Sequence, residues 1–144
     1  MEPQELTAIR DLADDNPSDV AAQVLAAYAC DSSDLEAEAV VYYDRVWDLG
    51  VPADERHDFL IGYGSTLRNV GRLDDSIEVL NTAVAENDDD LAARSFLALA
   101  LHSAGRSDDA VALLVEAVVE SGGTGVYRFS PALESYAEEL RSKP

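Results

Sequence analysis

The sequence predicts an all-α fold, a stack of three helical hairpins with one additional helix at each end. Residues 67–86 and residues 101–120 lie 34 positions apart, and nine of their twenty paired positions are identical. A fixed period of this length is typical of helix-turn-helix arrays, in which each repeat buries its apolar face by stacking on a neighbour. Hydrophobic residues make up 47% of the 144 positions, which is sufficient for a core, and strictly alternating β-branched runs are absent.

Residue types that begin and end helices divide the first third of the chain. Pro3 suits the first turn of a helix, and apolar residues follow it at helical spacing. Asn16 and Pro17 interrupt that pattern. Asn16 is expected to cap a second helix, and Pro17 suits the first position of that helix. Ser33 and Glu36 have the spacing of a capping box, which predicts the start of a third helix.

Glycines and aspartates mark the helices that follow. Gly50, Gly71 and Gly105 are each expected to end a helix, because glycine adopts the left-handed conformation that a sharp helix stop requires. Pro52 is expected to open the fourth helix, and aspartates after the other two glycines complement the positive end of the next helix. The glycine-rich residues 122–125 are predicted to form a flexible connection. The expected helices cover residues 3–15, 18–30, 33–49, 52–70, 74–86, 91–104, 107–121 and 131–142.

The two end helices are expected to cover the outer apolar faces of the stack. Ser130 and Pro131 have the residue types of a cap and a first helical residue, and they predict the start of the last helix. Its contact with the preceding helix is predicted to join Leu133, Tyr136 and Leu140 to Val111, Leu114 and Val118.

The chain is strongly acidic. It carries 29 acidic and ten basic residues, a formal charge of −19, and the acids are spread along the chain. Nucleic-acid affinity depends on basic residues that displace counterions, so this charge argues against a nucleic-acid partner. The charge either steers a basic partner or only keeps an exposed helical surface in solution, and the even distribution favours the second interpretation.

Composition also points to a cytoplasmic protein. No stretch reaches about 18 consecutive apolar residues, so neither a membrane span nor a membrane partner is expected. The first residues lack the apolar core of a secretory signal. Cys30 is the single cysteine and has no internal disulfide partner, as is common in reducing compartments.

The pattern resembles the tetratricopeptide repeat family, whose 34-residue repeat spaces large and small residues over two helices. In the repeat 57–90 these places are filled by Leu60, Tyr63, Gly64, Leu67, Ser76 and Leu80. In the repeat 91–124 they are filled by Arg94, Leu97, Ala98, Leu101, Ala110 and Leu114. Small residues let helices approach, and large residues fill the gaps beside them. An earlier repeat, 20–53, matches more loosely, and Arg94 replaces a large apolar residue of the family pattern.

This resemblance implies a right-handed α-solenoid that forms a single domain over residues 1–144. The domain would contain repeats at about 20–53, 57–90 and 91–124 and a capping helix at 130–142. The chain is most similar to small bacterial proteins built from a few such repeats.

Residues capable of catalysis or metal binding do not form a recognisable pattern in the sequence. His57 and His102 are 45 residues apart, and neither has a second ligand at metal-binding spacing. Cys30 occupies a packing place, and the acidic residues 88–90 lack the acid spacing, glycine and closing glutamate of a calcium loop. The sequence therefore predicts no enzyme activity, no metal and no cofactor.

Recognition of another protein is the function that the repeats imply. The first helices of such repeats line a concave face, and the packing places on those helices are already assigned. Family members that hold acidic C-terminal tails use paired lysines and asparagines there, and this role does not carry over because these places are apolar or weakly polar. We expect a neutral or basic protein or peptide on this face, or alternatively a second copy of the chain in a homodimer. The predicted partner-binding residues are Tyr28, Ile61, Ser65, Arg68, Asn69, Ser95, Leu99 and His102.

Overall fold

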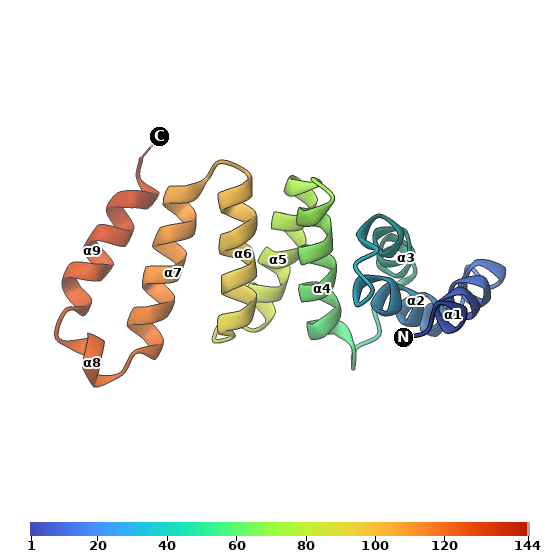
Figure 1. Cartoon of the computed structure of the whole chain (residues 1–144). Coiled ribbons are helices and arrows are strands. Elements are labelled where there is room, and N and C mark those ends of the chain that lie inside the picture. The colour runs from blue at the N-terminus through green and yellow to red at the C-terminus, as the bar shows by residue number, and fades with distance from the viewer. Residues whose placement is uncertain (144) are drawn as a thin grey trace. The chain divides into compact units, whose positions relative to one another are not determined.

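Helices joined by short turns make up the fold in the computed structural model, which describes residues 1–143 (Figure 1). Within this range there are nine helices and no strand, so the predicted all-α class is confirmed. The helices are α1 (Pro3–Asp15), α2 (Val20–Asp31), α3 (Glu36–Leu49), α4 (Arg56–Asn69), α5 (Leu73–Glu86), α6 (Leu91–Ser103), α7 (Ser107–Ser121), α8 (Thr124–Tyr127) and α9 (Ser130–Arg141).

The chain divides into two compact units. The N-terminal unit, Met1–Arg72, contains α1 to α4, and the C-terminal unit begins at Leu73 and contains α5 to α9. In the N-terminal unit α2 packs against α1 and α3, and α4 packs against α3. In the C-terminal unit α6 packs against α5 and α7, and α9 packs against α7. Each unit therefore has its own set of neighbouring helix pairs.

An aromatic cluster forms the core of the N-terminal unit. The Tyr43 ring of α3 lies 5.3 Å from the Phe59 ring and 5.4 Å from the Tyr63 ring of α4, centroid to centroid. The Tyr43 hydroxyl donates a hydrogen bond of 2.7 Å to Asp31 Oδ2 at the end of α2. Burial and this carboxylate raise the pKa of Tyr43. Gly62 faces this hydroxyl, and its lack of a side chain permits the close contact between α3 and α4.

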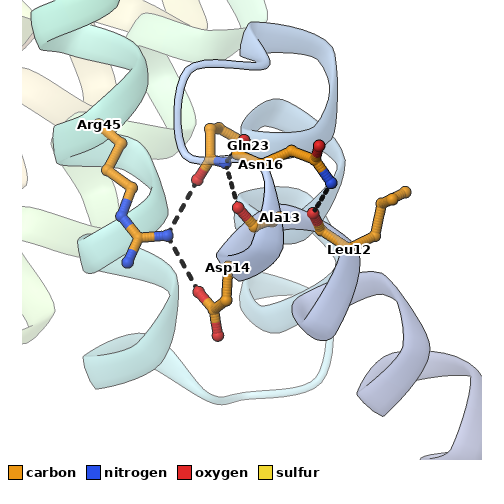
Figure 2. Close-up of polar contacts among 6 residues, drawn as sticks. All are labelled: Leu12, Ala13, Asp14, Asn16, Gln23 and Arg45. Atoms are coloured by element: carbon orange, nitrogen blue, oxygen red, sulfur yellow. Dashed lines mark hydrogen bonds and ion pairs between the residues drawn. The ribbon is translucent and has the colours of Figure 1, made fainter.

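A buried glutamine joins α1 to α2 (Figure 2). Where α1 ends, the Gln23 amide donates to the carbonyl oxygens of Ala13 at 2.7 Å and Asn16 at 3.0 Å. These oxygens also accept the backbone N–H groups of Asn16 and Asp19. Arg45 of α3 donates to Gln23 Oε1 at 3.2 Å and to Asp14 Oδ1 at 3.0 Å. One side chain therefore fixes the first helix to the second, and an arginine connects both to the third.

Leucine and alanine side chains form most of the core of the C-terminal unit. Its buried cluster consists of Leu80, Leu97, Ala98, Ala100, Leu101 and Ala110. Arg94, which departs from the family pattern, is buried in α6, and its guanidinium forms an ion pair of 2.5 Å with Glu120 of α7. The arginine therefore fills a packing place with its stem and has a charged partner for its head group.

The starts of several helices differ from the sequence prediction. α2 begins at Val20 rather than near residue 18, because Asp19 is its cap and accepts a hydrogen bond from the Ala22 N–H at 3.1 Å. Asn16 was predicted to cap α2. Its amide instead donates to the Leu12 carbonyl at 2.9 Å and satisfies the end of α1.

Two further predicted starts are wrong for local reasons, and one short helix was not predicted. Ser33 lies in the turn after α2 and does not cap α3, which begins at Glu36 without a side-chain cap. Pro52 lies in a turn before α4, which begins at Arg56. The glycine-rich connection contains the short helix α8.

The last helix covers α7 with part of the predicted set: Leu133 and Leu140 are half-buried, and Leu133 lies beside Val111, Leu114 and Val118. Ala137 of α9 is buried, and Arg141 forms a bidentate ion pair with Glu116 of α7, both bonds 2.8 Å long. Tyr136 was predicted to lie in this contact but is 64% exposed. The residues that α9 was predicted to cover, Val111, Leu114 and Val118, are 42–52% exposed. An apolar stripe on α7 therefore remains open to solvent.

Candidate functional site

The predicted binding residues of the N-terminal unit lie on α2 and α4. Ile61, Ser65 and Arg68 are spaced four and three residues apart on α4, so they share one side of this helix, and all three are partly exposed. Asn69 follows them, and its amide donates a 2.7 Å hydrogen bond to Glu36 Oε1 of α3. This side of α4 is polar at its C-terminal end and apolar at Ile61.

Tyr28 is less available than the sequence suggested. Its hydroxyl donates to Glu55 Oε2 at 3.2 Å, and its ring lies 6.2 Å from the Tyr43 ring. Burial, with the Glu55 carboxylate second, raises the pKa of Tyr28. A half-buried tyrosine with an occupied hydroxyl has mainly a packing role.

The predicted residues of the C-terminal unit share one groove. Ser95, Leu99 and His102 line the wall that α6 contributes to a cavity of about 440 Å³ between α6 and α7. We call this cavity the α6–α7 groove. Its complete lining is Ser95, Ala98, Leu99, His102, Ser107, Ala110, Val111 and Leu114.

The groove has small residues at its base and larger apolar residues at its edges. Ala98 and Ala110 are buried, so they form the floor, whereas Leu99, Val111 and Leu114 are 42–48% exposed and form the walls. At one end His102 Nδ1 and Ser107 Oγ lie 2.8 Å apart and satisfy each other. Apolar atoms therefore dominate the surface that a ligand would touch.

A second, shallower apolar cavity continues from the same wall. It has a volume of about 230 Å³ and is lined by Val111, Leu114, Val115, Val118 and Leu133. Because Val111 and Leu114 border both cavities, the apolar surface runs from α6 across α7 to α9. The sequence indicated an apolar face on α7 from the spacing of these residues, but it predicted that α9 would cover this face.

The C-terminal unit that contains the groove is acidic. The C-terminal unit contains 14 acidic and five basic residues, a formal charge of −9 with histidine neutral. Arg94, Arg106 and Arg141 each form an ion pair with a carboxylate of this unit. An incoming ligand therefore meets a negative field around an uncharged groove.

Residues that could support catalysis are held in packing or surface roles. Cys30 is buried, and burial raises the pKa of its thiol, which disfavours the nucleophilic thiolate. Within residues 1–143 no group of three or more histidine, cysteine, aspartate or glutamate side chains could hold a metal ion. His57 belongs to the N-terminal unit and His102 to the C-terminal unit.

The helices of the described residues 1–143 include none with the length and apolar character needed to cross a membrane.

Comparison with known proteins identifies a family. The model of a family described as Tetratrico peptide repeat matches residues 20–140, which include α2 to α8 and nearly all of α9. Neither a curated protein nor a solved structure matches the chain.

Proposed function

Since the chain belongs to the tetratricopeptide repeat family, we propose that it is a non-enzymatic interaction module that holds a peptide or helix of a partner protein on the concave face of its repeats. The repeats are proposed to form a single domain, with units at about 20–53, 57–90 and 91–124 and the capping helix at 130–142. The open α6–α7 groove is the observation that carries the proposal, because its volume of about 440 Å³ and its mainly apolar lining with a few polar groups are typical of ligand sites.

The proposed contact residues come from both units. Ile61, Ser65, Arg68 and Asn69 supply one partly exposed side of α4, and Ser95, Leu99 and His102 supply the α6 wall of the groove. Tyr28 would contribute the exposed part of its half-buried side chain. We propose a neutral or basic partner, because the formal charge of −19 would repel an acidic one. We also propose a cytoplasmic location.

A capture experiment with a double variant tests the proposal. Ile61→Ala with Leu99→Ala removes one apolar anchor from each unit, and we expect it to recover less of the partner from a cell extract while its helical circular dichroism is unchanged. The matched control is Leu12→Ala with Leu49→Ala, which truncates two exposed leucines outside the proposed surface. Equal recovery by the parent and by both double variants would show that the surface is assigned wrongly.

A homodimer that uses the same apolar surface is the alternative function. The exposed leucine and valine side chains around the groove favour it, and repulsion between two chains of equal negative charge opposes it. Light scattering over a range of protein concentrations separates the two functions, because a monomer at every concentration excludes the homodimer.

A further inference from the structure

We propose that the α6–α7 groove binds a basic amphipathic helix, whose apolar side chains contact Leu99, Val111 and Leu114. This inference rests on the proposed function and deepens it, because it names the site within the C-terminal unit and the chemistry of the occupant. The α7 wall, which the sequence assigned to the interior, becomes half of the binding surface.

The shape of the groove fits side chains that project from a rod. Its floor consists of the small residues Ala98 and Ala110, so large side chains can enter between the two walls. Along α7, Val111 and Leu114 of the groove together with Val118 of the adjoining cavity extend over about 10 Å, or two helical turns. Two or three apolar side chains at helical spacing would match this length.

The polarity of the lining favours a helix over an extended peptide. An extended peptide must satisfy its own N–H and C=O groups, usually by pairing with a sheet edge. The walls here are helices, whose interior backbone groups are already bonded. The polar side chains of the lining are also engaged, because His102 and Ser107 bond to each other and Ser95 donates to the Leu91 carbonyl. A helix satisfies its backbone internally, so it can enter an apolar groove without losing hydrogen bonds.

The charge around the groove selects a basic occupant. The C-terminal unit carries a formal charge of −9, and three of its five basic residues are paired with local carboxylates. Lysines or arginines on the outer face of a bound helix would gain from this field, whereas glutamates would be repelled. The same repulsion acts against a second copy of this acidic chain.

Three synthetic peptides of about 18 residues, or five helical turns, provide the test. The basic peptide places leucines on one helical face and lysines elsewhere, the acidic peptide replaces each lysine by glutamate, and the scrambled peptide keeps the basic composition but distributes the leucines around the helix. Fluorescence anisotropy with the full chain measures each affinity at about 0.15 M salt. We expect the basic peptide to bind at least about tenfold more tightly than either of the others.

Variants of the groove then locate the binding site. Leu114→Asn on α7 and Leu99→Asn on α6 should each weaken binding of the basic peptide by about tenfold, because each removes a leucine contact from the interface. Leu25→Asn is the matched control, since this exposed leucine of α2 lies outside the groove, and it should bind the peptide as the parent does. Two groove variants on different helices keep the test valid if one of them fails to fold.

Several results would overturn the inference. If the scrambled peptide bound as tightly as the basic peptide, charge alone would account for the attraction. If the acidic peptide bound as tightly as the basic peptide, charge would not select the occupant. Binding that Leu114→Asn leaves intact but Ile61→Ala weakens would place the site on α4, so the proposed function would stand and this inference would fail. A dimer that Leu114→Asn dissociates would identify the occupant as a second copy and would contradict both.

Discussion

Gly62 determines how closely α4 can approach α3. A Cβ atom at this position would lie 2.6 Å from the Tyr43 hydroxyl oxygen, which Asp31 holds in place. We expect Gly62→Ala to lower the free energy of unfolding by about 1–3 kcal/mol through overpacking, although alanine favours a helix over glycine by about 1 kcal/mol. Urea denaturation followed by circular dichroism measures this change.

Two controls identify the cause of that loss. Gly125→Ala adds a methyl group where no atom lies within 4 Å, so it should not destabilise the protein in the same way. In a Tyr43→Phe background, which lacks the clashing oxygen, Gly62→Ala should lower the free energy of unfolding by less. The double-mutant cycle gives the coupling energy between positions 43 and 62. A Gly62→Ala protein as stable as the parent would show that α3 and α4 separate without cost.

Gln23 has a structural role that its residue type does not reveal. Gln23→Ala removes both hydrogen bonds to the end of α1, takes the Oε1 acceptor away from Arg45, and leaves a cavity where the buried side chain was. We expect a loss of about 2–4 kcal/mol in the free energy of unfolding, measured by urea denaturation. Gln4→Ala, at an exposed position of α1, is the matched control and should have little effect. Similar losses in the two variants would argue against the buried clamp.

The ion pair between α7 and α9 makes stability depend on pH. Hydrogen bonds from Arg141 lower the pKa of Glu116, so the folded protein binds this proton less readily than the unfolded chain. The stabilisation is fully present above the ordinary glutamate pKa of about 4.3, and it is lost as the pH falls through the lower folded-state pKa. Relative to the parent, Glu116→Gln should lower the free energy of unfolding by about 0.5–1 kcal/mol at pH 7, a small value because the pair is partly exposed. Below the folded-state pKa of Glu116, the variant and the parent should be equally stable.

Arg141→Gln should give the same pH profile, because it removes the other partner. Thermal melts of the three proteins across this pH range provide the measurement. A difference between parent and variants that does not change with pH would mean that the pair acts through packing rather than charge.

Removal of α9 tests what the last helix covers. Truncation after Gly125 removes the buried Ala137 and the partner of Glu116, and we expect the melting temperature to fall by at least several degrees. Tyr136→Ser, at a position 64% exposed, is the control and should melt close to the parent. A truncated protein that melts with the parent and remains in solution would contradict a capping role.

Eight of the nine helices of the described residues could be predicted from the sequence, and the short helix α8 could not. α4 to α7 follow from the 34-residue period, and their turns at Gly71 and Gly105 have φ angles of +85° and +79°, as the glycines required. α8 has only four residues, too few to show a helical period, and it was therefore missed. Helix starts were wrong where several capping residues compete within a few positions, as at Asn16 and Asp19.

The candidate site was half predictable for a similar reason. Ser95, Leu99 and His102 remain on α6 when the family's packing places are removed, and they do line the groove. Val111 and Leu114 on the opposite wall have the spacing of a buried helical face. Sequence spacing shows that a face is apolar but not how much of it the next helix covers, which here depends on the contact made by α9.

The formal charge of −19 affects the stability of the whole chain. Few of the 29 acidic residues can find a basic partner among ten, so repulsion within the folded protein should outweigh its ion pairs. We expect the melting temperature to rise when sodium chloride increases from about 0.02 M to about 0.2 M, because the Debye length shortens over this range. Differential scanning calorimetry measures the change, and potassium chloride should give the same curve. A melting temperature that falls with salt would show that the ion pairs dominate.

The packing of each helix on its neighbours in the chain has a kinetic consequence. In both units the main contacts join helices that follow one another closely in sequence, such as α2 with α3 and α6 with α7. Only short loops must close before these contacts form, so the search for the native state is brief, and proteins of this topology fold in microseconds to milliseconds. The same locality means that a 34-residue unit could be duplicated or lost in evolution while the remaining helices keep their partners.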